Sequence, residues 1–528
     1  MNVHAVSSAR SDKLETMIAR AILTLLSVGA GALAGPAAGE APAATPAERA
    51  IAAHMRFLAG DLLEGREPGT RGYEIAAEYV RAQFESIGLE TSYQPVEFRS
   101  AKLIEEQSSF AIDNQSLTIR KDVLLRPSFL SQTSEVSAPV VFAGFGITAP
   151  ELHLDDYSSI DARGKIVLML SGAPPNFPTD QRAFYSGSRL KEKNAAQHGA
   201  VGVLTMLTPI DEQRAPFAKR AQQSGIPPML YLDENGRPAD AIDGIRLSAT
   251  VNQATGERLR AGEHTVAART VSEFSKAKSE NVIGILHGNV DESVVLSAHL
   301  DHLGNHVGRA LSPSEPAESR LHDSIYNGAY DNGSGIACLI EIARALASGP
   351  RPKRSIVFVA FTGEEKGDQG SEYFARHPPI RPLVADVNMD MFLMLYPVGD
   401  LVALGGEHST LGEIAAQAAH EVGFAMSPDP YPEEVRFIRS DQFSFVEEGI
   451  PAIHLKPGSK SLDPKIDGAA VTRDWLRRIY HSPADDMNQH FDFESGARYA
   501  ETNLQLVRAI ANAPERPRWK PGDFFAPK

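Results

Sequence analysis

The stretch IVFVAFTGEE, residues 356–365, joins an uninterrupted apolar run to a pair of glutamates. A continuous apolar run of this length is typical of a parallel strand that is covered by helices on both faces. Ligands of open α/β sheets gather at the carboxyl ends of the strands. The stretch therefore predicts an α/β fold and places Glu364 and Glu365 where reacting groups are expected.

The sequence around this stretch repeats the same pattern. From about residue 281, apolar strands alternate with amphipathic helices, and two further helices precede them near the N-terminus. We expect a mainly parallel-stranded mixed sheet flanked by helices. The predicted strands are 281–286, 294–298, 356–361 and 387–389, and the predicted helices are 47–58, 72–87 and 336–346.

The segment 115–275 has a different pattern of predicted secondary structure, with short β runs separated by turns. Strands are expected at 139–142, 165–170 and 201–205, with a helix at 189–198 before the last of them. No catalytic constellation occurs in this segment. We interpret it as an inserted, β-rich accessory domain.

Composition excludes several classes of protein. The chain has 528 residues and a formal net charge of −15, with no basic stripe, which argues against a nucleic-acid partner. Cys338 is the single cysteine, so an intrachain disulfide and a zinc cage built from thiolates are both excluded. Any metal ion must be held by imidazole and carboxylate groups.

The N-terminus has the pattern of an export signal. A basic stretch precedes the apolar run 21–33, and a small-residue cleavage site predicts a cut after Ala34. The run is too short to span a bilayer, so we expect no stable membrane insertion after cleavage. The mature protein would be secreted or periplasmic, beginning with a linker over 35–46. Translation starts at Met1 or Met17.

Imidazole and carboxylate groups recur where predicted strands end. Two divalent ions about 3.5–4 Å apart can clamp a nucleophile and the carbonyl that it attacks, and they need a carboxylate that bridges them. Asp331, in the glycine-rich turn 330–335, is the candidate bridge. The other groups are His299, Asp301, Glu364, Glu365, Asp390 and His481.

Spacing assigns roles to two of these pairs. Adjacent residues in an extended segment point in opposite directions, so one of Glu364 and Glu365 can bind metal while the other accepts a proton. In the His299-x-Asp301 pair, the aspartate can reach the far ring nitrogen and fix the tautomer of the imidazole.

The ordered motifs SAHLDHLG, IYNGAYDNGSG, FTGEEKGDQGS, NMDM and YHSPADD resemble those of the M28 zinc peptidases, the aminopeptidase Y or bacterial leucyl aminopeptidase type. The resemblance covers about residues 281–510 and the N-terminal helices. It implies the zinc-exopeptidase, phosphorylase/hydrolase-like fold and two Zn²⁺ ions, with Co²⁺ or Mn²⁺ as alternatives.

The resemblance also implies individual roles. His299 and Asp390 would hold one ion, Glu365 and His481 the other, and Asp331 would bridge them. Glu364 would be the general base, Asp301 the partner that orients His299, and Tyr480 the group that stabilises the oxyanion.

The inserted segment is similar to a protease-associated (PA) domain in GFGITAPELHLDDYSSIDARGKIVLML and LKEKNAAQHGAVGVLTM. Such domains are β-rich, non-catalytic and commonly cover part of the active-site cleft. The predicted division is 47–114 for the first part of the peptidase domain, 115–275 for the insertion, 276–515 for the catalytic domain and 516–528 for a C-terminal tail.

Two features depart from the family pattern. The gap between His299 and Asp331 is long, which predicts a loop over the site at 303–330. Tyr330 stands before Asp331, where the family often has a second aspartate. Neither departure touches a predicted ligand, so both concern specificity rather than chemistry.

The leading functional hypothesis is an aminopeptidase acting on peptides. A carboxypeptidase or amidase of the same fold and a non-catalytic receptor-like protein are the alternatives. Arg439 is a candidate substrate residue that would favour carboxylate recognition, with a structural salt bridge as its equal alternative.

Four other histidines are interpreted as supporting or surface groups, and the sequence leaves the oligomeric state open. These histidines are His302, His306, His322 and His454.

Overall fold

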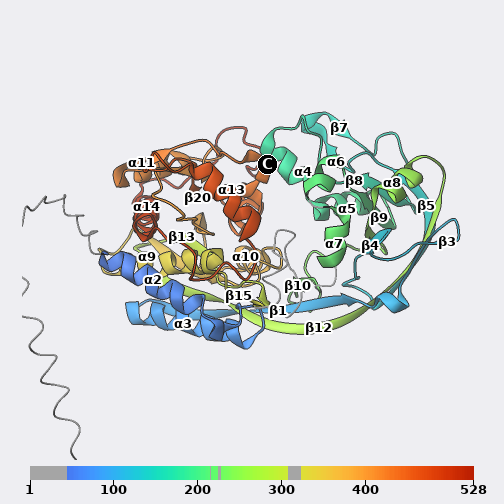
Figure 1. Cartoon of the computed structure of the whole chain (residues 1–528). Coiled ribbons are helices and arrows are strands. Elements are labelled where there is room, and N and C mark those ends of the chain that lie inside the picture. Colours follow the sequence, from blue (N-terminus) through green and yellow to red (C-terminus); the bar gives the residue numbers. More distant parts are fainter. Residues whose placement is uncertain (1–43, 215, 224–226, 307–322) are drawn as a thin grey trace, which may run out of the picture. The chain divides into compact units, whose positions relative to one another are not determined.

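The computed structural model describes residues 44–528 except 215, 224–226 and 307–322 (Figure 1). Thr45–Lys528 forms one compact unit. The predicted export signal, 1–34, lies outside the described residues, as does the linker up to residue 43. Among the helices that are described, none combines the length and apolar character needed to cross a membrane.

A mixed sheet carries most of the predicted site residues. Strands β20, β17, β13 and β16 are parallel to one another, and antiparallel strands flank them on both sides, which confirms the predicted fold class. The strand order is β19 (Ala425–Met426), β18 (Asp400–Leu404), β20 (Ala452–Pro457), β17 (Leu383–Asn388), β13 (Val290–His299), β16 (Arg354–Phe361), β12 (Thr265–Leu286) and β1 (Glu90–Leu103).

Helices cover both faces of this sheet, as the apolar run predicts. Every residue of β16 is buried. Alternate residues Ile356 and Phe358 belong to one hydrophobic cluster, whereas Val357 and Val359 belong to another on the opposite face. The first face is covered by α2 (Pro46–Leu58), α3 (Arg71–Ile87), α9 (Gly335–Ala347), α11 (Leu411–Val422) and α14 (Phe493–Asn512), and the second by α10 (Gln369–Arg376) and α12 (Gln442–Glu447).

The start of α2 falls slightly before the predicted one. Thr45 caps the helix by accepting a hydrogen bond from the backbone N–H of Glu48, and its hydroxyl donates to the Glu48 carboxylate. Pro46 occupies the first helical position, where its missing N–H leaves no bond unmade. The last residues of the predicted linker, 35–46, therefore belong to the helix and its cap.

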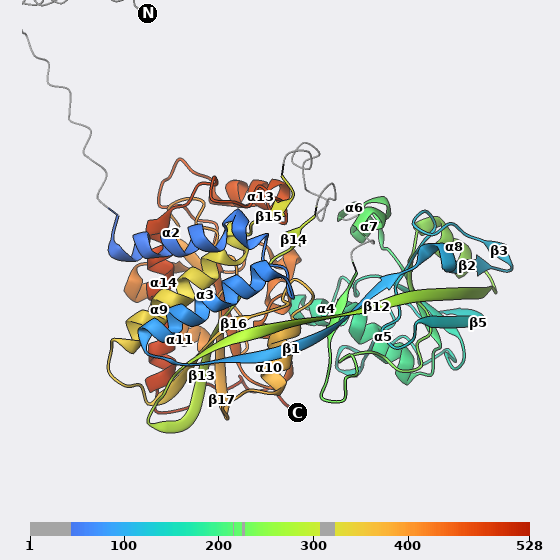
Figure 2. The same ribbon diagram turned by 90° about the horizontal axis from the view of Figure 1, so that it is seen from below.

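Strands β1 and β12 form a long antiparallel ribbon that continues from the catalytic sheet into the accessory region (Figure 2). The first half of β12 pairs with β5 and its second half pairs with β16. Strand β12 crosses residue 275 without a break, so the predicted boundary lies inside one strand, and the domain division stays a prediction.

The accessory region has its own hydrophobic core. Its sheet and helices comprise β2 (Ser109–Ile112), β4 (Val123–Leu125), β5 (Thr133–Phe142), β8 (Ile166–Leu170), β9 (Gly202–Met206), β10 (Met229–Tyr231), β11 (Ser248–Val251), α4 (Thr179–Ser186), α5 (Ser188–Gln197), α6 (Pro209–Arg214), α7 (Phe217–Gln223) and α8 (Gln253–Arg260). The observed β8, α5 and β9 match the strand–helix–strand order predicted there.

Arg66 joins several loops close to the predicted site residues. Its guanidinium is fully buried and donates hydrogen bonds to the carbonyl oxygens of Leu58, Leu300, Asn327 and Gly328. Burial lowers the pKa of Arg66 to about 10, so the group stays charged at neutral pH. One side chain thus ties the end of α2 to the segments after β13 and before Asp331.

We expect Arg66→Met to destabilise the protein strongly. The substitution leaves buried carbonyl oxygens without donors, so the free energy of unfolding should fall by about 3 kcal/mol or more. Urea denaturation of the two proteins measures this difference. Arg81→Met on α3, whose side chain is 28% exposed, is the control and should change the midpoint little. An Arg66→Met protein with an unchanged midpoint would contradict the role assigned to Arg66.

Candidate metal centre

Five of the predicted residues meet at the carboxyl edge of the parallel strands. His299 ends β13, Glu365 follows β16 and Asp390 follows β17. Asp331 lies in the turn 329–334 that opens α9, and His481 follows α13 (Gly468–Arg478). Segments that are far apart in the chain therefore converge on one point, as the strand ends predict.

His299 faces two carboxylates. Its Nε2 lies 3.3 Å from Oδ1 of Asp331 and 3.6 Å from Oδ1 of Asp390. The imidazole and Asp331 are buried, and the Asp390 side chain is nearly so. These three groups are close enough together to hold one metal ion.

His481 also faces two carboxylates. Its Nε2 lies 3.2 Å from Oδ2 of Asp331 and 3.3 Å from Oε2 of Glu365. The two oxygens of Asp331 thus face two different imidazoles. This is the arrangement expected of a carboxylate that bridges two ions.

The donor set fits a pair of divalent cations. Zinc lies about 2.0–2.1 Å from nitrogen and oxygen ligands, so neighbouring ligand atoms of a tetrahedral site are about 3.3 Å apart. The separations around Asp331, 3.2–3.6 Å, match this value. They are long for charge-assisted hydrogen bonds, which are typically about 2.7–2.9 Å.

The electrostatics of the cluster also favour cations. Burial lowers the pKa of His481, but Glu365 and Asp331 outweigh it and raise the value to about 10. Burial raises the pKa of Asp331, but His299 and His481 hold it well below its usual range. Buried carboxylates are costly without a positive partner, and a bound divalent ion would supply that charge.

Glu364 stands beside the cluster. Desolvation in the cleft raises its pKa well above the usual value; His299 opposes this rise, whereas Asp368 and Glu365 add to it. A raised pKa makes this carboxylate a better proton acceptor than an ordinary glutamate.

Asp301 has different partners from those predicted. Its carboxylate lies 4.0 Å from Nδ1 of His299, and the atom within hydrogen-bonding distance of that nitrogen is the backbone oxygen of Asp301, at 3.2 Å. The carboxylate instead accepts hydrogen bonds from the backbone N–H groups of Glu364 and Glu365. Asp301 therefore orients His299 through its main chain and holds the glutamate pair through its side chain.

His302, which the sequence analysis interprets as a supporting or surface group, lies against the cluster. Its side chain is fully buried, and its Nδ1 lies 2.6 Å from Oε1 of Glu365. The other carboxylate oxygen of Glu365, Oε2, faces His481. The distance between His302 and Glu365 is that of a hydrogen bond rather than of two ligands around one ion. The contact fits a positioning role for His302, which fixes the orientation of Glu365.

Asp485 is a residue that sequence reasoning missed. It is buried and accepts hydrogen bonds from the backbone N–H groups of Tyr330 and Asp331 at 2.9 and 3.0 Å. Burial raises its pKa to about 7. Asp485 belongs to the motif YHSPADD, so its closeness to His481 in the sequence could have identified it.

The remaining predicted residues lie around this centre. The ring of Tyr480 stacks on that of His481. Burial raises the pKa of the Tyr480 hydroxyl well above the usual value, and the negative charges of Asp331 and Glu365 raise it further. Arg439 forms the salt bridge that was its alternative assignment, with Glu434 at 3.3 Å. Tyr330 is buried and donates a hydrogen bond to the backbone oxygen of His490, which makes it a structural residue.

The accessory region contributes to the surroundings of the centre. A cavity of about 220 Å³ opens on Glu365 and Lys366 and is also lined by Pro227, Pro228 and Met229 from the accessory region. The predicted loop 303–330 begins and ends in the pair β14 (Gly304–Asn305) and β15 (Ile325–Tyr326), whereas residues 307–322 lie outside the described residues.

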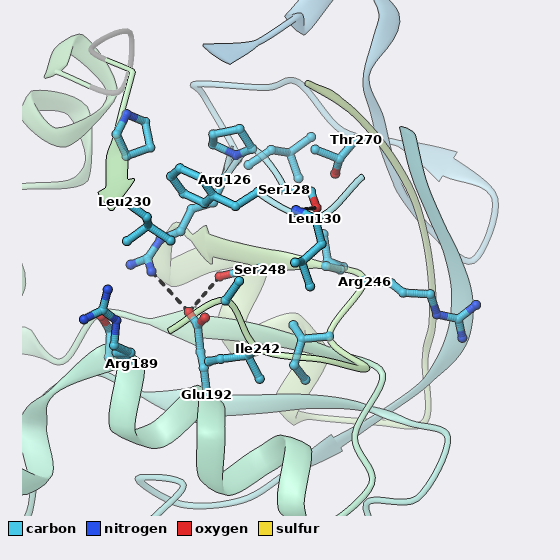
Figure 3. A pocket seen from close by; sticks show the side chains of 18 of the residues that line it. Arg126, Ser128, Leu130, Arg189, Glu192, Leu230, Ile242, Arg246, Ser248 and Thr270 are labelled. Carbon is cyan, nitrogen blue, oxygen red and sulfur yellow. Dashed lines mark hydrogen bonds and ion pairs between the residues drawn. The ribbon is translucent and has the colours of Figure 1, made fainter. Parts of the chain in front are cut away.

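A larger cavity, of about 590 Å³, lies within the accessory region (Figure 3). Arg126 and Ser248 both contact the carboxylate of Glu192, at 3.1 and 2.8 Å, and Leu230 and Ile242 add apolar surface. It contains none of the predicted catalytic residues. The predicted catalytic residues lie instead at the centre around Asp331.

Paired imidazole and carboxylate groups at the strand ends of such a sheet define a metal-dependent hydrolase. Comparison with known proteins assigns it more closely. Residues 281–507 match the model of peptidase family M28.

Individual relatives span most of the chain. Aminopeptidase YwaD of Bacillus subtilis is 26% identical over 501 residues, which are 90% of this chain and 89% of that protein. An aminopeptidase of Pseudomonas aeruginosa is 25% identical over 75% of this chain and 67% of its own length. The solved aminopeptidase of Aneurinibacillus sp. strain AM-1 shares the fold, with a TM-score of 0.54, 20% identity and coverage of 90% of this chain and 96% of that one.

Proposed function

We propose that this protein is an exported zinc aminopeptidase of the M28 type, which uses two metal ions to release N-terminal residues from peptides. The curated relatives that span most of the chain are named aminopeptidases. Relatives from Pyrenophora species are named probable zinc metalloproteases. These names support the substrate class and the metal.

The arrangement of Asp331 is the observation that carries the two-metal proposal. Its two oxygens lie 3.3 and 3.2 Å from the imidazoles of His299 and His481. Each imidazole has a further carboxylate of its own, Asp390 and Glu365 respectively. The proposed ligand set is therefore one shared carboxylate with one imidazole and one carboxylate on each side.

The neighbouring side chains supply the proton transfers. Zinc ions in this site would polarise the scissile carbonyl and lower the pKa of the attacking water. Glu364 accepts the proton of that water at its carboxylate and then delivers it to the leaving amine. Tyr480 keeps its proton because its pKa is raised, so its hydroxyl can donate a hydrogen bond to the oxyanion.

We expect Tyr480→Phe to lower kcat by about 10²–10³-fold, because removing one oxyanion donor has an effect of this size. The substitution keeps the ring that stacks on His481, so KM and zinc content should change little. Steady-state kinetics with leucine p-nitroanilide measure both constants. A rise in KM with unchanged kcat would assign Tyr480 to substrate binding instead.

Substrates with free and blocked N-termini test the aminopeptidase activity. The purified mature protein should hydrolyse leucine p-nitroanilide and lose this activity when a chelator removes its metal. It should leave N-acetyl-leucine p-nitroanilide intact. Equal hydrolysis of the two compounds would contradict an aminopeptidase and favour an amidase of the same fold.

Recognition of a substrate carboxylate has less support. Arg439 was the residue that would favour a carboxypeptidase, and its guanidinium is paired with Glu434. A carboxypeptidase is therefore not favoured by any contact at this position.

Export is supported by the sequence before residue 35. That segment has the order of basic, apolar and small residues that export signals require. A relative from Mycobacterium tuberculosis is named a probable lipoprotein aminopeptidase. N-terminal sequencing of protein recovered from outside the cytoplasm should begin at Gly35, and recovery only from the cytoplasm with the segment intact would contradict export.

A further inference from the structure

A second group of metal-ligating side chains lies outside the centre around Asp331. Asp180, Glu407 and His408 each offer one ligand atom, and these atoms lie within 4.8 Å of one another. Asp180 belongs to the first turn of α4 in the accessory region. Glu407 and His408 lie in the loop between β18 and α11 of the catalytic region. The group shares no residue with the catalytic centre.

His408 is oriented like a metal-binding histidine. It is 6% exposed, and its Nδ1 lies 2.8 Å from Oδ2 of Asp523. Histidines that bind metal through one ring nitrogen usually donate the other N–H to a carboxylate or carbonyl in this way. The ring stacks on Phe437 and meets Phe525 edge-on, so its direction is fixed by packing.

The other ring nitrogen points into the group without a hydrogen bond. Nε2 of His408 is buried and has no hydrogen-bond partner among the described residues. The nearest recorded carboxylate oxygen, Oδ2 of Asp180, lies 3.3 Å away. This separation equals the spacing of about 3.3 Å expected between two ligands of one tetrahedral zinc ion. It also matches the separations around Asp331.

A cavity borders the two carboxylates of this group. Asp180 and Glu407 line a cavity of about 760 Å³. Glu413 and Asp429 add negative charge to its wall, and Asp429 is paired with Arg436. Lys520 is a further cation on the lining. Carboxylates therefore outnumber cations on the lining of this cavity.

Packing holds Asp180 in place opposite His408. Phe184, one turn after Asp180 on α4, contacts Phe443, Phe524 and Phe525. The last two belong to the same C-terminal segment as Asp523. The aromatic contacts thus join α4, the catalytic region and the C-terminal segment at the position of the acidic group.

We propose that Asp180, Glu407 and His408 form a third metal site, which binds Zn²⁺ and links the accessory region to the catalytic region. Three protein ligands leave the fourth position of a tetrahedral ion to water from the cavity. Asp523 is the positioning residue that aims His408. The role of the site is to hold α4 against the loop after β18, not to take part in hydrolysis.

Zinc content and zinc location together test this site. The full mature protein is equilibrated with Zn²⁺, freed of excess metal and analysed for zinc per chain. We expect Asp180→Asn and His408→Ala each to hold one zinc fewer than the natural protein, with kcat on leucine p-nitroanilide unchanged. Glu413→Gln, which alters another carboxylate of the same cavity, should keep the full content.

Asp523→Asn separates metal binding from a merely structural histidine. It keeps the shape of the side chain but presents a weaker partner to Nδ1, so affinity for the third zinc should fall by about 10–100-fold. Equal zinc contents in the natural protein, Asp180→Asn and His408→Ala would overturn the proposal. A protonated His408 that bridges Asp180 and Asp523 would then account for the contacts.

Anomalous scattering at the zinc edge distinguishes this proposal from the proposed function. A peak beside Nε2 of His408 supports the third site whatever is found at Asp331. Peaks at Asp331 without one at His408 overturn the third site alone, and the reverse result overturns the two-metal centre alone.

Discussion

Glu364→Gln should lower kcat by about 10²–10⁴-fold, the usual contribution of a positioned general base. The substitution keeps the size and polarity of the side chain but removes its ability to accept a proton. Zinc content should stay that of the natural protein, because Glu365, rather than Glu364, is the glutamate whose Oε2 faces His481.

Kinetics and metal analysis on the same preparation provide the test. Glu421→Gln, on the exposed side of α11, is the matched control and should retain full activity. A fully active Glu364→Gln protein would remove Glu364 from the mechanism. Loss of zinc together with activity would mean that the two glutamates have been assigned the wrong roles.

Asp331→Asn should have an effect at least as large. The amide presents one oxygen and one NH₂ group, so the substituted side chain can no longer offer an oxygen to both metal positions. We expect at least one zinc to be lost from the centre. Loss of metal polarisation should lower kcat/KM by about 10³-fold or more, since such stabilisation is worth several kcal/mol.

Asp386→Asn is the control for this variant. Asp386 is buried in β17 of the same sheet, and burial raises its pKa well above the usual value. Its Oδ1 accepts a hydrogen bond from Ser297, and an amide oxygen can replace it. The control should keep its zinc and activity, whereas an active Asp331→Asn protein would contradict the bridging role.

The sheet and the cluster were predictable because local signals decide them. The apolar run in β16 is typical of a strand that helices cover on both faces. Residues that follow neighbouring parallel strands lie at the same edge of the sheet, whatever the conformation of the loops. The ribbon of β1 and β12 was not predictable in the same way. Residues 273–278 of β12 are largely exposed, so no apolar alternation marks them as a strand.

Individual side-chain contacts could not be predicted from the sequence either. The spacing of His299 and Asp301 puts two acceptors near the ring, and only the path of the backbone decides that the carbonyl oxygen meets it. Arg66 reaches carbonyl oxygens up to 262 positions away in the chain, and Asp180 approaches His408 in a similar way. Such contacts depend on tertiary packing, which no local pattern records.

The positions of the zinc ions in crystals of the mature protein test the central claim most directly. Anomalous difference maps should contain two peaks about 3.5–4 Å apart. One should lie between Asp331, His299 and Asp390, and the other between Asp331, Glu365 and His481. A single peak at this centre, or two peaks that do not share Asp331, would contradict the account.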